Sequence, residues 1–340
     1  MSETIEVHAF ITLTIAFIVF FIGVFLSRHV AFLRDYNIPE PVAGGLFAAL
    51  FTWAFYGAFG QKIVFDIDAR DELLVIFFAT IGLNARVSDL LVGGRLLGIL
   101  LVLTVVFIFV QNTVGLIGTQ LFGLPAGTGV LVGSASLIGG HGTAIAWGPT
   151  IKEATGFVAS EEIGIATATL GLVCAALLGG PIAKYLIDRD KLEPVASDGP
   201  IVGLPYETEP TKDDDIDHIN LMRAMLAANV AVILGYIANQ GIAAMGLKLP
   251  LFVPCLLAGI LMSNTIPFIF PKVPWPARTK ALAILSDFCL SVFLAMSLMS
   301  MQLWTLAGLV GPIVGILVLQ VLAATAFILL VVYRFMGADY

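Results

Sequence analysis

Gly133-Ser-Ala-Ser-Leu-Ile-Gly-Gly-His-Gly-Thr-Ala-Ile-Ala-Trp147 is the stretch that decides how this chain folds. It lies within Leu96–Ile151, a run of 56 residues without Lys, Arg, Asp or Glu, in which His141 is the one ionisable residue. A single helix needs only about 20 apolar residues to cross the hydrocarbon of a membrane. The stretch is nevertheless rich in Gly, Ser and Thr, and non-helical backbone is tolerated at membrane depth only where protein buries it or water lines it. The combination predicts a path for a solute, and hence a transporter.

The composition restricts the class of protein. Of the 340 residues, 59% are hydrophobic and 12% are charged, and the mean hydropathy is +1.00. These values predict a polytopic membrane protein rather than a soluble domain. The formal net charge of −7 comes from the segment between Asp188 and His218, which holds ten acidic and three basic residues, so the rest of the chain is neutral. We interpret that segment as a solvated linker, and nothing in the composition indicates nucleic-acid binding.

Neither the N-terminus nor the cysteines indicate processing or a metal. The first eight residues lack the positive region of a signal peptide, so Ala9–Ser27 is predicted to be a retained first span. Cys174, Cys255 and Cys289 lie inside apolar segments, without the spacing of a metal site or a disulfide framework. We expect them to be small core residues.

Charge-free stretches mark the predicted membrane spans. Leu73–Ala85 has only 13 residues, too few to cross without extending into its flanks. Short or interrupted hydrophobic segments often point to a transport site. The predicted spans are Ala9–Ser27, Pro41–Gly60, Leu73–Ala85, about two passes within Leu96–Ile151, Ile163–Ala183, Ala224–Leu247, Leu249–Pro271, Ala281–Leu303 and Leu306–Tyr333.

The basic residues of short loops predict the orientation, because such residues collect on the cytoplasmic side. An external N-terminus satisfies all of them on one condition: Ala126–Pro149 must enter and leave on the same side, as a re-entrant hairpin. The basic residues concerned are Arg28, Arg34, Arg86, Arg95, Lys184, Arg189, Lys272, Arg278, Lys280 and Arg334.

The count of spans predicts two halves of opposite orientation. Residues 1–187 hold five spans and a hairpin at about 126–149, residues 188–218 form an acidic cytoplasmic linker, and residues 219–340 form the second half. An odd number of crossings starts the second half from the opposite side, as in transporters with inverted repeats. Pro41–Leu46 resembles Pro254–Gly259, and Phe77–Thr80 resembles Val292–Ala295. In the next apolar span of each half, a glutamine sits deep in the segment: Gln111 in the first and Gln320 in the second.

Several motifs make the chain similar to the bacterial sodium/glutamate symporters. The longest are Asn37-Ile-Pro-Glu-Pro-Val-Ala-Gly-Gly-Leu46, Phe77-Phe-Ala-Thr-Ile-Gly-Leu-Asn-Ala85 and Ser136-Leu-Ile-Gly-Gly-His-Gly-Thr143. Thr169-Leu-Gly-Leu-Val173 with Gly179-Gly-Pro181, and Phe293-Leu-Ala-Met-Ser-Leu298, add to them. The resemblance runs from about residue 10 to the C-terminus.

This resemblance implies an all-α, inner-membrane carrier that moves glutamate together with sodium and forms a homodimer. It implies two inverted repeats, each giving a re-entrant hairpin to a mobile core that slides against a scaffold, as in an elevator. The family pattern continues beyond Arg334–Tyr340 into a second hairpin and a final span. By our count of spans, the second half also lacks the partner of Ala126–Pro149. An incomplete, non-transporting fragment therefore stays open as an alternative.

The hairpin offers a way to bind glutamate without a buried cation, since no Lys or Arg lies in the middle of a span and a fixed charge there is costly. Free backbone N–H groups at the N-terminus of a half-helix attract anions, and unwound carbonyls suit a sodium ion. Glycines permit the close approach and positive φ of such a tip. The predicted substrate contacts are Ser134, Ser136, Gly139, Gly140, His141, Gly142 and Thr143.

Other buried polar residues have more than one interpretation, three for His141 and at least two for the rest. His141 could bind glutamate, carry a proton near neutral pH, or brace the hairpin. Thr80, Asn84, Asn112 and Thr169 are candidates for sodium binding, or for hydrogen bonds between helices. We expect Thr167 and Thr169 to satisfy a local backbone carbonyl, and the pairs Gly44-Gly45 and Gly179-Gly180 to allow close helix packing.

Three competing functions remain. A related carrier could move another small di- or tricarboxylate, such as a citrate-like anion, because the hairpin chemistry alone does not separate these anions from glutamate. An intramembrane hydrolase could use Ser134 or Ser136 with His141, but no buried acid orients that histidine. The third is the fragment already named. We therefore predict a transporter and not an enzyme, without a cofactor, with sodium as the coupling ion and membrane lipids as further partners.

Overall fold

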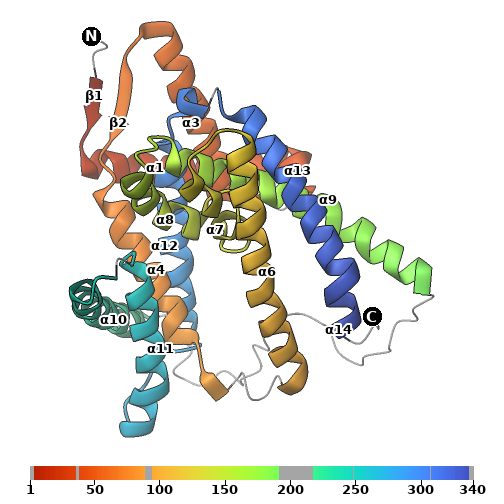
Figure 1. The fold of residues 1–340 in the computed structure, drawn as a ribbon. Coiled ribbons are helices and arrows are strands. Elements are labelled where there is room, and N and C mark those ends of the chain that lie inside the picture. The colour runs from red at the N-terminus through yellow and green to blue at the C-terminus, as the bar shows by residue number, and fades with distance from the viewer. Residues whose placement is uncertain are drawn as a thin grey trace. The chain divides into compact units, whose positions relative to one another are not determined.

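The computed structural model describes residues 4–35, 38–88, 94–190, 217–247, 249–306 and 308–336, and these are almost entirely helical (Figure 1). In the first half the elements are β1 (Thr4–Val7), α1 (Ala9–His29), α2 (Ala31–Asp35), α3 (Glu40–Phe59), β2 (Lys62–Phe65), α4 (Asp68–Asn84), α6 (Gly94–Leu121), η1 (Ala126–Val130), α7 (Ser134–Leu137), α8 (Gly140–Thr155) and α9 (Ser160–Asp190). The second half contains α10 (His218–Ala244), α11 (Phe252–Ile269), α12 (Lys280–Met299), η3 (Leu303–Leu306), α13 (Val310–Phe327), a π-helical turn (Ile328–Val332) and α14 (Tyr333–Phe335).

The helices confirm the predicted all-α, polytopic membrane architecture. Among the described residues, seven helices are long and apolar enough to cross a membrane. At the short span predicted at Leu73–Ala85, α4 begins at Asp68 and so extends into the charged flank, but with 17 residues it is not one of these seven helices. The predicted linker is tested only at its ends: α9 continues to Asp190 and α10 starts at His218, while 191–216 lie outside the described residues.

The start of α3 follows directly from its sequence. Pro39 occupies the N-cap, Glu40 lies in the first turn, and Pro41 is among the first helical residues. A proline there has the φ a helix needs and no N–H to leave unpaired, while a carboxylate interacts favourably with the helix dipole. The helix ends at Gly60, whose φ of +67° is left-handed.

The contacts within the chain define two compact units. The first comprises Met1–Leu74, Ile99–Gly179 and Cys289–Val332, and the second comprises Val75–Gly98, Gly180–Phe288 and Tyr333–Tyr340. Each is described by itself.

In the first unit α1 and α3 cross with their backbones in contact. A Cβ on Gly44 would lie 2.0 Å from the Val19 carbonyl oxygen, and one on Gly23 would lie 1.9 Å from the Glu40 carbonyl oxygen. No side chain fits at either position, so the prediction of close packing at Gly44 is confirmed. The same prediction is wrong at Gly179, where a Cβ would meet nothing within 4 Å among the described residues.

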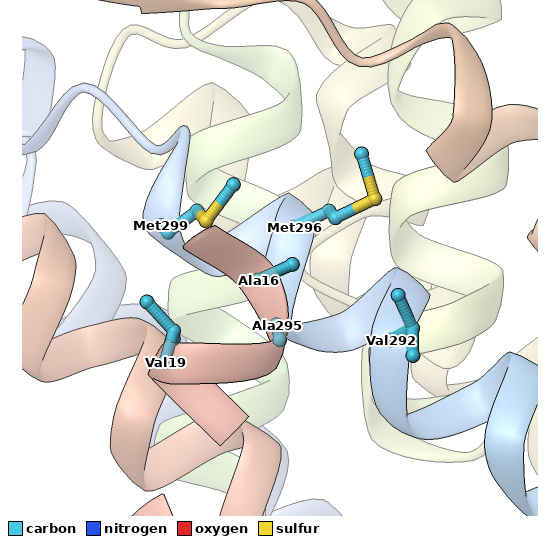
Figure 2. Packing of buried hydrophobic residues seen from close by; sticks show 6 residues of the cluster. All are labelled: Ala16, Val19, Val292, Ala295, Met296 and Met299. Carbon is cyan, nitrogen blue, oxygen red and sulfur yellow. The ribbon is translucent and has the colours of Figure 1, made fainter. Parts of the chain in front are cut away.

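The core of this crossing is formed by α1 and α12. Figure 2 shows small and flexible apolar side chains from both helices gathered there. Small residues on α1 let the helices approach, and the methionines fill the remaining irregular space. The cluster consists of Ala16, Val19, Val292, Ala295, Met296 and Met299.

A parallel pair of short strands was not expected from the sequence. β1 and β2 lie side by side near the N-terminus, with Thr4 opposite Lys62 and Val7 opposite Phe65 (Figure 1). The ammonium group of Lys62 lies 5.8 Å from the centre of the Tyr56 ring and 6.0 Å from that of the Trp304 ring, close enough for cation–π attraction. The strand pair thus ties the segment before α1 to the segment after α3.

The second unit is built around α10, α11 and the end of α4. A Cβ on Gly235 of α10 would lie 2.5 Å from the Cys255 Cα of α11. One turn further along α11, a Cβ on Gly259 would lie 2.7 Å from the Ala79 carbonyl oxygen of α4. The second unit therefore contains two helix crossings with backbone contact, one between α10 and α11 and one between α11 and α4.

Candidate functional site

The predicted hairpin contains a break in the helix. α7 ends at Leu137, Ile138 and Gly139 follow, and α8 starts at Gly140. Gly140 has a φ of +72°, in the left-handed region that favours glycine. The predicted positive φ is therefore found at Gly140, whereas Gly139 has a φ of −75° and Gly142 is not in the left-handed region.

The N–H groups of the first turn of α8 have no carbonyl partners within the helix, as at any helix start. They belong to Gly140, His141, Gly142 and Thr143. The preceding residues are accessible, since Gly139 is exposed and Ile138 is 42% exposed. Thr143 donates its hydroxyl to the Gly139 carbonyl at 3.0 Å, which holds the break against the helix that follows.

Asn112 of α6 holds the start of α7. Its side-chain oxygen accepts the Ser134 N–H at 3.1 Å and the Ser134 hydroxyl at 2.8 Å. Both bonds satisfy donors at the first residue of α7, so the predicted ion candidate Asn112 and the predicted substrate contact Ser134 are brought together. In this arrangement Asn112 positions the hairpin.

Ser136 lies deeper than a surface contact would. It is 2% exposed, and its hydroxyl donates to the Leu131 carbonyl. This bond uses the hydroxyl proton and leaves the oxygen lone pairs as acceptors. A carboxylate cannot donate to those lone pairs, so any ligand of Ser136 in this conformation would have to be a donor or a cation.

His141 is buried at 7% exposure, and its ring contacts one hydroxyl. Nε2 lies 2.9 Å from the Thr169 hydroxyl oxygen, which also lies 2.9 Å from the Ile165 carbonyl oxygen. We assign the one proton of the Thr169 hydroxyl to the Ile165 carbonyl, and with this assignment Nε2 of His141 carries a hydrogen. Nδ1 of the neutral ring is then an acceptor. Two candidates from separate helices, His141 and Thr169, are thereby brought together.

The one buried Lys or Arg among the described residues is Arg70, at the start of α4. Its guanidinium lies 2.7 Å from the Asp71 carboxylate and 3.3 Å from that of Glu161. Arg70 is therefore already paired.

Comparison with known proteins identifies the family. The family model described as sodium/glutamate symporter matches residues 5–340. The sodium/glutamate symporter of Escherichia coli is 37% identical over 330 residues, which cover 97% of this chain and 81% of that protein. That of Haemophilus influenzae is 34% identical over 341 residues, which cover 100% of this chain and 83% of the relative. The chain belongs to the sodium/glutamate symporter family.

Membership of this family confirms the predicted resemblance and removes the hydrolase, since these proteins are transporters and not enzymes. The structure offers the hydrolase no support either. Ser134 is bonded to Asn112, Ser136 to Leu131, and His141 to Thr169, so the described hydrogen bonds contain no serine–histidine pair. In a sodium/glutamate symporter the sodium ion is the coupling ion rather than a resident cofactor.

Two candidates lie in the second compact unit, where Thr80 bonds a neighbouring helix and Asn84 bonds a loop. Thr80 donates to the Phe77 carbonyl at 2.7 Å, and its oxygen lies 2.9 Å from the Ser286 hydroxyl. Asn84 accepts the N–H of Arg278 at 2.8 Å, where Arg278 has a left-handed φ of +64°. Both partners suit the interpretation as hydrogen bonds between segments.

Sequence reasoning undervalued three buried polar side chains of this symporter. The hydroxyl of Thr167 has no hydrogen-bond partner among the described residues, so the expectation of a bond to a local carbonyl is wrong. The side-chain oxygens of Gln111 and Gln320 likewise have no partner within the described part of the chain. The sequence does single out these glutamines, because each lies deep in an apolar segment of its half.

Proposed function

We propose that this protein carries glutamate into the cell with sodium across the inner membrane, by alternating access. The observation that carries the proposal is the helix break at Ile138–Gly139, found in a chain that belongs to the sodium/glutamate symporter family. Interrupted helices near the middle of the membrane are typical of substrate sites in secondary transporters.

The N-terminus of α8 is the proposed site for a carboxylate of glutamate. Free N–H groups and the positive end of the helix dipole attract anions without a fixed cation. Arg70 is already occupied by Asp71 and Glu161, which supports recognition by backbone groups in its place. Gly139 and Gly140 keep the approach open for the ligand, and the hydroxyl of Thr143 lies in the same turn.

His141 is proposed to contact the ammonium group of glutamate. Its Nε2 hydrogen is given to Thr169, so the neutral ring has only Nδ1 to offer, as an acceptor. An ammonium group is a matching donor, whereas a carboxylate is not. This assignment selects the substrate contact over the proton carrier among the interpretations of His141.

An inverted repeat is supported because each half contributes one helix that packs against helices of the other half. In the first unit, α12 of the second half packs against α1 and α3: a Cβ on Gly45 would lie 2.4 Å from the Leu298 Cβ and 3.5 Å from the Ala295 carbonyl oxygen. In the second unit, α4 of the first half packs against α11 in the corresponding manner, at Gly259 and Ala79. When Pro41–Leu46 is aligned with Pro254–Gly259, Gly45 lies within one residue of Gly259. When Phe77–Thr80 is aligned with Val292–Ala295, Ala79 lies within one residue of Ala295, so the two contacts involve nearly equivalent positions.

The packing of α6 on α13 supports the same repeat. Phe107 in the middle of α6 stacks on Phe327 at the end of α13, whereas Phe122, just past the end of α6, meets Gly315 near the start of α13. The two helices therefore run antiparallel. Between these contacts Gln320 donates to the Gln111 carbonyl at 2.8 Å. Equivalent residues that meet where equivalent helices cross in opposite directions are expected at a two-fold axis of an inverted repeat.

The remaining features of the proposal follow from charge and family. The rule that basic loops face the cytoplasm supports an external N-terminus and a hairpin at about 126–149 that re-enters from outside. Family resemblance supports a homodimer surrounded by lipid, with a core that slides against a scaffold. The residue boundaries proposed for the repeats and the linker are 1–187, 188–218 and 219–340.

Sodium-dependent uptake tests the function. The purified protein would be reconstituted in liposomes, and radiolabelled glutamate would be supplied with an inward gradient of sodium or of choline. We expect uptake of radiolabelled glutamate with the sodium gradient and none with the choline gradient. Unlabelled glutamate should reduce this uptake, and citrate should not. Uptake that citrate blocks would replace glutamate by a tricarboxylate. Absence of sodium-dependent uptake of either anion would contradict the proposal, and would favour the alternative of a chain that does not transport.

A matched pair of variants tests the site. Gly140→Val places a branched side chain at a left-handed position, and should abolish most of the uptake. Gly179→Ala changes a glycine whose added Cβ would meet nothing within 4 Å, and should leave uptake unchanged. Equal uptake by the two variants would contradict the assignment of glutamate to this helix break.

A further inference from the structure

Two buried side-chain oxygens of the first unit have no hydrogen-bond donor. Gln111 of α6 is 5% exposed and Gln320 of α13 is 2% exposed. The Oε1 atom of each is without a partner among the described residues. Buried polar atoms are nearly always paired, and a buried unpaired acceptor destabilises a protein, so each exception requires an explanation such as a bound ion or water.

The orientation of the Gln320 amide is fixed by its own bonds. Nε2 donates to the Gln111 carbonyl at 2.8 Å and to the Val132 carbonyl at 3.0 Å. An amide nitrogen has two hydrogens, and both are used. Turning the amide over would set Oε1 against two carbonyl oxygens, which repel it. Oε1 of Gln320 is therefore an acceptor without a donor among the described residues.

Other oxygens gather beside these glutamines. Around the point where a Cβ on Gly133 would stand lie three oxygens: the Gly129 carbonyl at 2.7 Å, the Asn112 side chain at 2.9 Å and the Gln111 carbonyl at 3.1 Å. A Cβ on Gly115, one turn beyond Gln111, would lie 2.2 Å from the same Gly129 oxygen and 3.5 Å from Nε2 of Gln320. Glycines at both positions allow carbonyl oxygens to approach α6.

The environment is thus rich in acceptors and poor in donors. Within the described residues, no group of three His, Cys, Asp or Glu could hold a metal ion, so an ion bound here would have neutral oxygen ligands. Neutral amide and carbonyl oxygens are hard ligands that suit a cation of low charge, and unwound backbone supplies them in sodium-coupled carriers. A water molecule could donate to both oxygens as well, but it would not respond to sodium.

We propose that the side-chain oxygens of Gln111 and Gln320 bind a sodium ion where α6 and α13 cross beside the turn 131–133, between η1 and α7. The inference rests on the proposed function, since it names a site for the coupling ion of that transport. It also adds a mechanical link: Asn112, the neighbour of Gln111, holds the N-terminus of α7 through Ser134. An ion at Gln111 therefore stabilises the end of the hairpin that precedes the proposed glutamate site.

The test measures the sodium requirement of variants of Gln111. Gln111→Met keeps the shape and removes the oxygen, while the bonds from Gln320 to the Gln111 backbone and to Val132 remain. Sodium would replace choline at constant ionic strength, and both glutamate uptake in liposomes and thermal unfolding in detergent would be followed. We expect the sodium concentration for half-maximal uptake, and for half-maximal stabilisation, to rise by about tenfold or more. Gln120→Met, on the exposed face of the same helix, is the matched control and should change neither.

A purely structural glutamine predicts the opposite result. Removal of an unpaired buried amide would then leave the sodium requirement unchanged and raise the melting temperature without sodium. That result would overturn the inference and leave the proposed function intact. Absence of sodium dependence in the unmodified protein would overturn the proposed function itself, and the ion site with it.

A second variant keeps the inference testable if Gln111→Met does not fold. Gln111→Glu retains one side-chain oxygen and adds a negative charge, so a cation site predicts an equal or lower sodium requirement. A rise of about tenfold in this variant would contradict a cation at Gln111.

Discussion

Two regions of the first compact unit differ in the kind of atoms that they bury. Where α1 crosses α3 and α12, glycines bring backbones into contact and the space between is filled by alanine, valine and methionine. Where α6 and α13 meet the segment 126–143, the helix is broken at Ile138–Gly139 and side-chain oxygens are left unpaired.

The difference separates the part of the molecule that holds its shape from the part that binds. A dry crossing with backbone contact has one packing arrangement, because any added atom forces the helices apart. In the second region the described residues leave N–H groups and side-chain oxygens without hydrogen-bond partners. Ligands can supply the missing partners. The account therefore expects substitutions in the first region to change stability, and substitutions in the second to change affinity for glutamate or sodium.

The largest expected effect is at the crossing of α1 and α3. In Gly44→Ala the new Cβ would stand 2.0 Å from the Val19 carbonyl oxygen, so the helices must separate. We expect a loss of about 3 kcal/mol in the free energy of unfolding, measured in detergent with a chemical denaturant. Gly57→Ala on the same helix, where a Cβ meets nothing within 4 Å, is the control and should be neutral or slightly stabilising. Equal stability of the two variants would contradict the close crossing.

The corresponding crossing of the second unit should behave in the same way, with a smaller effect. In Gly235→Ala the Cβ would lie 2.5 Å from the Cys255 Cα, and we expect a loss of about 2 kcal/mol in the same unfolding experiment. Gly241→Ala, later in α10, meets nothing within 4 Å and serves as the control. A neutral Gly235→Ala would argue against equivalent crossings in the two halves.

At the helix break we expect an effect on binding. Gly140 has a φ of +72°, which asparagine tolerates and valine does not. Gly140→Val should weaken glutamate binding by about tenfold, the equivalent of the 1–2 kcal/mol that a left-handed residue costs. Gly140→Asn should bind more tightly than Gly140→Val. Calorimetric titration of glutamate at saturating sodium measures both, and the reverse order would contradict a left-handed tip at this position.

The smallest expected effect is at the partner of His141. Thr169→Val removes the oxygen that accepts the Nε2 hydrogen and leaves a buried donor unpaired, whereas Thr169→Ser keeps that oxygen. We expect Thr169→Val to lower the free energy of unfolding by about 1 kcal/mol and to weaken glutamate binding, with Thr169→Ser close to the unmodified protein. Thermal unfolding with and without glutamate would show it. If valine and serine behave alike, Thr169 does not orient His141.

Local composition was enough to predict the helices and the interrupted segment. The absence of charge over Leu96–Ile151, with Gly, Ser and Thr in its second part, predicted a long helix followed by irregular backbone. The structure has α6 and then the separate short elements η1, α7 and α8. The predicted span Pro41–Gly60 begins one residue after the start of α3, which the prolines around Glu40 define for a similarly local reason.

Pairings between distant residues could not be read from local pattern. Sequence shows that Ser134 and Ser136 both carry hydroxyls, but it does not show that Asn112 accepts one and the Leu131 carbonyl the other. The two-stranded pairing of Thr4–Val7 with Lys62–Phe65 and the ion pair of Arg70 with Glu161 depend on tertiary structure in the same way. Each segment is too short, or too ordinary in composition, for its sequence to predict which distant residues it contacts.

Hydrogen exchange followed by mass spectrometry tests the contrast between the two regions most directly. The protein would be compared in choline, in sodium, and in sodium with glutamate. We predict that sodium slows exchange at 111–115 and 126–134, that glutamate slows it further at 138–143, and that exchange at the crossing of α1 and α3 stays unchanged. Slower exchange confined to that crossing or to the second unit, with none at 126–143, would contradict the claim that the broken helix binds the ligands.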